Sequence, residues 1–346
     1  MLTRKSVCTT ILPCTILLCG ATLAWSADTA KSGAAKATPA PAGPKAGIKT
    51  PGILIPFSSL KNEAQVTVET PAWITAADSI LIPDRAKDVT LRVDTKNNKT
   101  LDPISVKKPC AGALSAFGSL WQPSCETKEL LRLDPKTLKT IATIPAGVGD
   151  MTIGIASVGD SVWLLSDNKV TLSRIDPAEN KVVGEMRLSP SCNSLLSADN
   201  SLWVTCPSEN KIVRIDPVKN LIVKRIEVSA TPKIASFGDG SIWVLCEKDG
   251  KIDRIDTKTN KVTKSIELGT PGIGGVLAYG ENFLWVSQPG YPLARIDTKD
   301  EKVMQQFWGE GGGLLAVSSG AIWIGNPSKG GVARFDTKRV IATLAE

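Results

Sequence analysis

One triplet, an arginine followed by an apolar residue and an aspartate, recurs along the chain at intervals of 39 to 42 residues. Its seven copies begin at Arg92, Arg132, Arg174, Arg214, Arg254, Arg295 and Arg334. A tryptophan stands eleven positions upstream of five of these arginines and ten upstream of Arg295, and Leu81 takes its place in the first copy. A period of about forty residues indicates a repeat architecture in which each copy is one structural unit.

Each copy is predicted to form four short strands separated by turns. Around Trp203 the strands are "NSLLSA", "SLWVTC", "KIVRID" and "LIVKRIEV", and they are joined by "DN", "PSEN" and "PVKN". Four strands per unit without a helical period are typical of a β-propeller blade, and closing the ring leaves no long exposed sheet edge. The sequence therefore predicts an all-β fold, a seven-bladed β-propeller of four-stranded antiparallel blades over residues 62–346.

The repeated residues have a predicted structural role. The second and third strands of a blade are antiparallel, which places Trp203 opposite Arg214, and directly opposite residues share a face. The ring can then cover the arginine, a contact worth about 0.5–1 kcal/mol. Asp216 begins a turn in which its carboxylate accepts backbone N–H groups. We expect tryptophan, arginine and aspartate to stabilise each blade rather than to form a site.

The N-terminal part of the chain carries an export signal and a tether. Residues 1–27 combine Arg4 and Lys5 with a following apolar stretch and small residues, so cleavage is expected after Ala24 or Ala27. Residues 28–61 are rich in alanine, proline and lysine and are predicted to be a flexible linker. We expect a periplasmic or secreted protein that does not insert into the membrane once the signal is removed.

Ring closure is also predicted by the sequence. The segment "AQVTVETP", which ends at Pro71, matches "TKSIELGTP" at Thr263 to Pro271, and that segment is an outermost strand of its blade. Residues 64–69 are therefore expected to add an outer strand to the last blade.

The repeat resembles that of the YVTN-type propellers, a group that includes the streptogramin-lyase-like (virginiamycin B lyase-like) proteins. It stands here as "FGDGSIWVLCEKDGKIDRIDTKTNKV", Phe237 to Val262, and the resemblance extends over about residues 64–346. The resemblance implies the seven-bladed fold. Streptogramin lyases, as a family, depend on a catalytic histidine and a magnesium site, and this chain has no histidine to which that role could be assigned.

Five cysteines follow the signal: Cys110, Cys125, Cys192, Cys206 and Cys246. Because the first and second strands of a blade are antiparallel, the start of one meets the end of the other. This pairs Cys110 with Cys125 and Cys192 with Cys206, as suits an exported protein. Cys246 has Pro232 at the partner position and is expected to be a free, partly buried thiol. The alternative, a metal site, lacks both a C-x-x-C pair and a histidine.

Composition restricts the chemistry further. Lysine plus arginine number 41 and aspartate plus glutamate 34, and this modest excess is too small to indicate nucleic-acid binding. Many lysines fall at turns such as "DTKTNK", where they are solvated. The absence of histidine removes the usual side chain that titrates near neutral pH and the commonest metal ligand. We expect no cofactor, no nucleic-acid partner and a monomeric state.

One face of a propeller carries the loops between fourth and first strands and between second and third strands. We call it the top face. At the channel entrance it presents small uncharged residues such as Thr70, Gly274 and Gly312. Exposed aromatic residues among polar groups favour recognition of a peptide, glycan or other ligand, and local packing of these residues is the alternative. The candidate ligand-binding residues are Trp73, Arg85, Asp150, Asn193, Lys233, Glu247, Gln288, Tyr291, Trp308 and Glu310.

The sequence thus predicts an exported propeller that acts as a binding or scaffold module through its top face. The partner is an unidentified protein, peptide or glycan, and no catalytic residue is assigned. The alternative is a streptogramin-lyase-like or lactonase-like metal-dependent enzyme that uses carboxylates such as Glu247 and Glu310. Metal-dependent turnover of a lactone or cyclic depsipeptide, abolished by Glu247→Gln or Glu310→Gln, would favour the enzyme.

Overall fold

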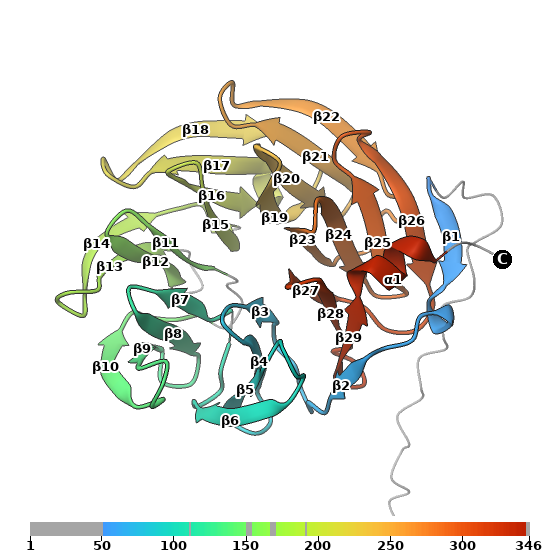
Figure 1. The fold of residues 1–346 in the computed structure, drawn as a ribbon. Coiled ribbons are helices and arrows are strands. Elements are labelled where there is room, and N and C mark those ends of the chain that lie inside the picture. Colours follow the sequence, from blue (N-terminus) through green and yellow to red (C-terminus); the bar gives the residue numbers. More distant parts are fainter. Residues whose placement is uncertain (1–50, 111, 150–153, 167–170, 191, 344–346) are drawn as a thin grey trace, which may run out of the picture. The chain divides into compact units, whose positions relative to one another are not determined.

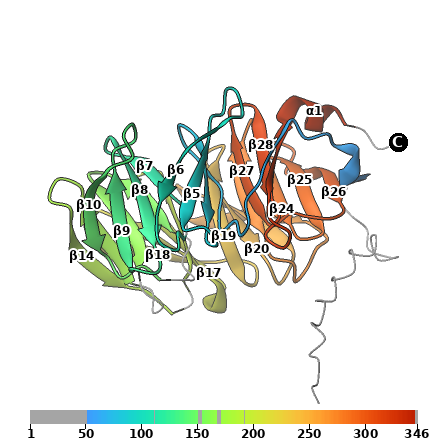
Figure 2. The same cartoon turned by 90° about the horizontal axis from the view of Figure 1, so that it is seen from below.

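The computed structural model describes residues 51–110, 112–149, 154–166, 171–190 and 192–343. These residues form seven sheets arranged as blades around a central axis (Figure 1). The side view shows the blades standing next to one another, with the strands running from one face of the ring to the other (Figure 2). The seven-bladed β-propeller predicted from the triplet repeat is confirmed.

Blades are numbered in chain order, each from its innermost to its outermost strand. Blade 1 comprises β3 (Thr75–Ala76), β4 (Ile80–Asp84), β5 (Val89–Val93) and β6 (Thr100–Ser105). Blade 2 comprises β7 (Leu114–Ala116), β8 (Ser119–Ser124), β9 (Glu129–Leu133) and β10 (Thr140–Pro145). Blade 3 comprises β11 (Ile155–Val158), β12 (Ser161–Ser166), β13 (Thr171–Asp176) and β14 (Lys181–Arg187). Blade 4 comprises β15 (Ser194–Ala198), β16 (Ser201–Cys206), β17 (Lys211–Asp216) and β18 (Leu221–Glu227), with the 3-10 turn η2 (Pro207–Glu209).

The remaining blades follow the same plan. Blade 5 comprises β19 (Pro232–Gly238), β20 (Ser241–Cys246), β21 (Lys251–Asp256) and β22 (Lys261–Glu267). Blade 6 comprises β23 (Val276–Gly280), β24 (Phe283–Gln288), β25 (Tyr291–Asp297) and β26 (Lys302–Trp308). Blade 7 comprises β27 (Leu314–Ser318), β28 (Ala321–Gly325) and β29 (Val332–Asp336), followed by α1 (Thr337–Ala342).

The N-terminal segment completes two blades. β2 (Ala64–Val66) pairs antiparallel with β29 and supplies the fourth strand of blade 7, which confirms the predicted closure. β1 (Ile53–Pro56) pairs parallel with β26 as a fifth strand on blade 6, outside it in Figure 1. The 3-10 turn η1 (Phe57–Ser59) follows, and the Phe57 ring lies 5.3 Å from that of Phe335. β1 lies before residue 62, the predicted start of the propeller, and its apolar "ILIP" already belongs to a sheet.

The predicted register of tryptophan and arginine holds in all blades, with Leu81 opposite Arg92 in the first. In blade 4 the Arg214 guanidinium carbon lies 5.0 Å from the centre of the Trp203 ring. Blades 2, 3 and 5 repeat this contact at 5.1 to 5.7 Å. Blade 6 differs, since Arg295 lies 4.7 Å from the Phe283 ring instead. The six tryptophans of the repeat are at most 1% exposed, so they form the packing between blades.

The repeated aspartate closes the turn between the third and fourth strands. The Asp216 carboxylate accepts hydrogen bonds from the backbone N–H groups of Val218 and Lys219 at 2.9 and 3.0 Å. In blade 7 the equivalent Asp336 caps α1 by accepting from the N–H of Arg339 at 2.8 Å. A short helix therefore replaces the fourth strand at this point, and β2 fills the outer position.

Both predicted disulfides are present, Cys110–Cys125 and Cys192–Cys206. Each joins the chain just before a first strand to the end of the second strand on the top face. Cys246 is free, but it is fully rather than partly buried. Burial and the nearby carboxylates of Asp253 and Asp249 raise the pKa of its thiol, so it is held as the neutral, unreactive form.

Candidate binding site at the channel mouth

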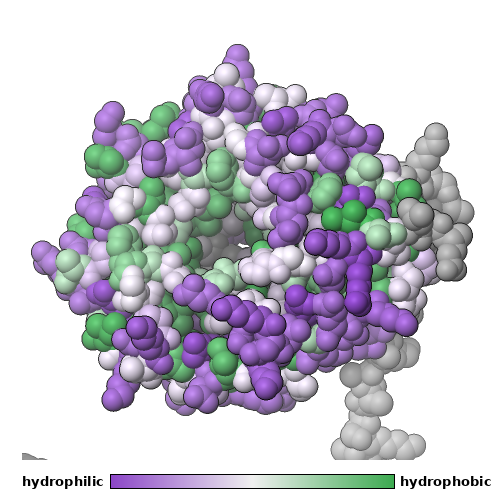
Figure 3. Space-filling model, in the orientation of Figure 1, coloured by the Kyte–Doolittle hydropathy of each residue, from purple (hydrophilic) through white to green (hydrophobic). Residues whose placement is uncertain are grey.

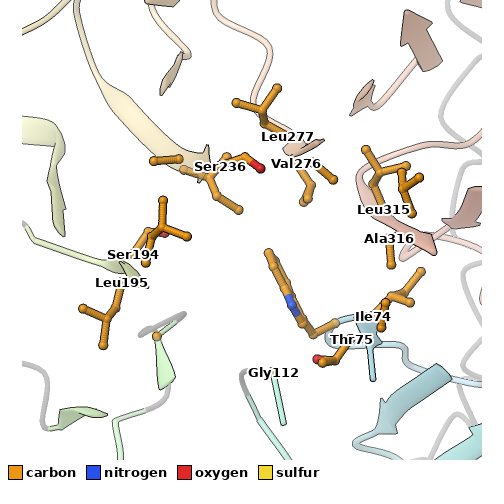
Figure 4. A pocket seen from close by; sticks show the side chains of 18 of the residues that line it. Ile74, Thr75, Gly112, Ser194, Leu195, Ser236, Val276, Leu277, Leu315 and Ala316 are labelled. Atoms are coloured by element: carbon orange, nitrogen blue, oxygen red, sulfur yellow. The ribbon is translucent and has the colours of Figure 1, made fainter. Parts of the chain in front are cut away.

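The innermost strands surround a cavity of about 390 Å³ at the centre of the ring. A hollow is visible there in Figure 3. Figure 4 shows side chains from several blades around it, among them the aliphatic Leu195 and Leu315, and the hydroxyls of Thr75 and Ser236, which accept hydrogen bonds from the N–H groups of Ala113 and Tyr279. None of the described residues that line it is charged. A ligand in this channel therefore finds apolar surface and neutral hydrogen-bonding groups.

Trp73 is the largest side chain in the lining. It comes from the loop between β2 and β3, and it is partly exposed. A Cβ at Gly112 would lie 3.0 Å from Trp73 Cδ1, so glycine leaves the space that the indole occupies in front of blade 2. Among the described residues its Nε1 has no hydrogen-bond partner. The first strand of each blade begins at the top face. Because Trp73 directly precedes the first strand β3, it lies at the top end of the channel.

Asp84 holds the loop that carries Trp73. Its buried carboxylate accepts hydrogen bonds from the N–H groups of Glu69, Thr70 and Ala86 at 3.0, 3.1 and 3.2 Å. Burial raises the pKa of Asp84, but these backbone donors and the Thr70 hydroxyl outweigh it and leave the pKa below its ordinary value. The charged form is thus the one that orders the loop.

Replacing Asp84 with asparagine is expected to lower the unfolding free energy at pH 7 by about 1–3 kcal/mol, because an amide cannot accept all of these bonds. The depressed pKa means that the charged carboxylate stabilises the fold above its unfolded pKa, and that this contribution is lost as the pH falls through the folded pKa. The difference between the two proteins in urea denaturation should therefore shrink below about pH 4. Asp94→Asn is the control, since Asp94 accepts the N–H of Lys96 in an exposed turn where asparagine serves equally. A difference that persists unchanged at low pH would refute the role of the charge.

Three predicted residues lie near one another at the mouth, on blades 4 and 5. The Lys233 ammonium is 3.5 Å from the Glu247 carboxylate, and both side chains are partly exposed. Asn193 Oδ1 accepts from the Thr205 hydroxyl at 3.1 Å, and the same hydroxyl is 3.3 Å from the Lys233 carbonyl oxygen. On blades 4 and 5 the mouth therefore carries a lysine–glutamate ion pair beside an amide.

The predicted residues of blade 6 do not line the channel. Gln288 is 1% exposed, and its amide accepts from the Thr270 hydroxyl and donates to the Ile273 carbonyl, so its side chain holds the loop before β23. Tyr291 opposes Gln288 at the β24–β25 hairpin, and Trp308 ends β26 beside Pro56 of β1. Both rings are partly exposed.

Glu310 forms an ion pair with Lys329 at a separate cavity of about 290 Å³ between blades 6 and 7, whose lining includes Phe57 and Phe335. Arg85 is exposed on blade 1, and Asp150 lies outside the described residues. Within the described ranges, no group of three or more aspartate, glutamate or cysteine side chains is placed to hold a metal ion.

Sequence reasoning missed the hydroxyls inside the channel. Ser194 and Ser236 lie on the first strands of blades 4 and 5, and both line the cavity. From the sequence alone, small residues on the first strands are interpreted as packing residues rather than as site residues. The signal that could have found them is the alternation of each first strand, because every second residue faces the axis.

A family model described as "Domain of unknown function (DUF5074)" matches residues 111–270. No curated protein matches the sequence. No helix in the described ranges is long and apolar enough to cross a membrane.

Solved structures share the fold. Virginiamycin B lyase from Staphylococcus aureus superimposes with a TM-score of 0.66 at 16% identity, over 79% of this chain and 98% of that one. A streptogramin B lyase gives 0.65 at 18% identity, over 80% and 96%. BamB from Moraxella catarrhalis gives 0.60 at 10% identity, over 80% and 97%. At these identities the likeness shows the architecture: the chain is a seven-bladed propeller with the fold of streptogramin B lyases.

Proposed function

We propose that this protein is an exported binding module that takes a segment of a partner protein at the top face, with an apolar side chain of that segment entering the channel mouth. The observation that carries the proposal is the uncharged cavity of about 390 Å³ with Trp73 at its top end. A partly exposed indole whose N–H has no partner among the described residues offers both apolar area and a donor to a ligand. Tryptophan also loses little conformational entropy when it anchors a partner.

The chemistry of the lining favours a peptide over a glycan. The lining is mostly aliphatic, although Leu195, Ile234, Val276 and Leu277 are at most 8% exposed, and an aliphatic wall suits a hydrocarbon side chain better than a sugar ring. The polar groups around it, the hydroxyls within and the Lys233–Glu247 pair at the rim, can pair with backbone amides of a bound segment. The two disulfides support a periplasmic or secreted location, because such bonds persist in oxidising compartments. The BamB-like architecture is consistent with a protein-interaction role.

The test is replacement of Trp73 by alanine in immobilised protein exposed to an extract of the producing cells. Loss of a central aromatic anchor typically costs 2 kcal/mol or more, so the affinity for the partner is expected to fall by at least about thirtyfold and capture to fall with it. Trp308→Ala is the matched control, since Trp308 is an equally large, partly exposed ring outside the channel. The proposal fails if Trp308→Ala removes capture and Trp73→Ala leaves it intact, which would place the site on blade 6. Circular dichroism melting of both variants separates lost binding from lost folding.

A further inference from the structure

The outer edge of blade 4 combines an open strand edge with exposed apolar side chains. β18 is the outermost strand of its sheet, drawn in yellow at the rim in Figure 1, and no described strand pairs with its free edge. Val218, Leu221 and Val223 are 84%, 44% and 50% exposed. An unpaired edge is a template for a further strand, and proteins usually protect it with charged or polar side chains. β18 carries the charged Lys224, Arg225 and Glu227, but two of its exposed positions, Leu221 and Val223, are aliphatic instead.

The same molecule shows that a blade edge of this kind accepts a further strand. On blade 6, β1 pairs with β26 in a parallel register that sets Ile53 opposite Gln305 and Pro56 opposite Trp308. The four-stranded parts of blades 4 and 6 share their topology, and each has a register shift at the same point between third and fourth strands. The covered edge of blade 6 is therefore a model for an occupied edge of blade 4.

Charge identifies the occupant. β18 exposes Lys224 and Arg225 together with Glu227, so its net charge is positive, and neither basic side chain has an ion-pair partner among the described residues. The chain's own residues 28–50 carry four lysines and the single acid Asp28, so they would be repelled. A second copy pairing edge to edge through β18 would bring like charges together. An extended segment that carries aliphatic residues and an adjacent pair of acidic residues, one on each face, matches both features.

We propose that β18 is a second docking surface, which binds an extended, acidic and aliphatic segment of a partner protein by strand addition. In this mode main-chain hydrogen bonds supply affinity and alternate side chains supply specificity. The surface is separate from the channel mouth, and the inference does not depend on the function proposed for the mouth.

The test uses the whole protein and a synthetic peptide of valines around an adjacent pair of glutamates, long enough to span β18. We expect binding by fluorescence anisotropy, and hydrogen-exchange protection confined to residues 221–227. Val223→Asp should weaken the affinity by at least about tenfold. Thr263→Asp, at the equivalent exposed position of β22, is the matched control and should leave it unchanged.

Reversing the charge sharpens the test. The double variant Lys224→Glu, Arg225→Glu should lose the acidic peptide and bind a lysine-containing version of it instead. Both positions are exposed, so the fold is expected to persist, and the Trp73→Ala variant should bind the acidic peptide normally. No binding of the peptide, binding unaffected by Val223→Asp, or protection on β22 instead of β18 would each overturn the proposal.

Discussion

Trp243→Ala should lower the free energy of unfolding by about 3–5 kcal/mol, the range typical of emptying a large aromatic site in a core. The Trp243 side chain is 0% exposed, its Nε1 donates to the Gly238 carbonyl at 3.0 Å, and Arg254 lies 5.3 Å from its ring centre. Its removal leaves a cavity between blades and a carbonyl without its donor. Urea denaturation followed by fluorescence of the remaining tryptophans measures the loss.

Phe237→Ala on the same blade is the control for this result. Phe237 is 40% exposed and lies opposite Ile242, so its truncation should cost less than about 1 kcal/mol. If Trp243→Ala were equally mild, the repeated tryptophan would not be the core residue of the blade, and the structural interpretation of the triplet repeat would be wrong.

Replacing Cys192 and Cys206 together by alanine should cost about 3 kcal/mol, because the disulfide closes a loop with a sequence separation of 14 and restricts the unfolded chain. The pair Cys110 and Cys125, with a separation of 15, should cost a similar amount. Thermal melting with and without reductant measures the stability of both double variants. Reductant should lower the stability of the unmodified protein but barely affect a variant in which all four of these cysteines are alanine.

Cys246→Ala serves as the matched control for the cysteines. Cys246 is buried and unpaired, so its replacement should leave the response to reductant unchanged. Peptide mapping without reduction should recover Cys246 as a free thiol. Its recovery in a disulfide with any of the other four would contradict the pairing.

The repeat made the blades predictable because it combines two simple constraints. The triplet fixes the third strand, and antiparallel pairing then fixes the register, so Trp203 opposite Arg214 and the Cys192–Cys206 disulfide followed from spacing alone. Ring closure by β2 followed from a second copy of the outer-strand pattern. These features depend on residues close in sequence or on the period itself.

The features that the sequence did not predict depend on partners far along the chain. β1 is a single four-residue strand with no repeat to mark it, and it is ordered by β26 some 250 residues later. Gln288 looked like an exposed polar loop residue, but Thr270 and Ile273 bury and satisfy its amide. Arg295 lies over Phe283 rather than over the ring opposite it, in the copy whose spacing is one residue short.

The candidate site was predictable only in part for the same reason. Trp73 was identified as an aromatic residue of a top-face loop, but its place in the channel lining depends on the space left by Gly112. Lys233 and Glu247 were identified singly, and the fold brings them together as an ion pair. Tyr291 and Trp308 belong to the same class of loop residue and lie outside the channel.

The most direct test of top-face binding is site-specific photocrosslinking in the cells that produce the protein. A photoreactive amino acid at Lys233 samples the channel mouth, and one at Lys258 samples an equally basic, exposed turn on the opposite face. Crosslinking of a discrete partner protein from position 233 and none from position 258 is the predicted result. Crosslinking of that partner from position 258 with none from position 233 would contradict binding through the top face.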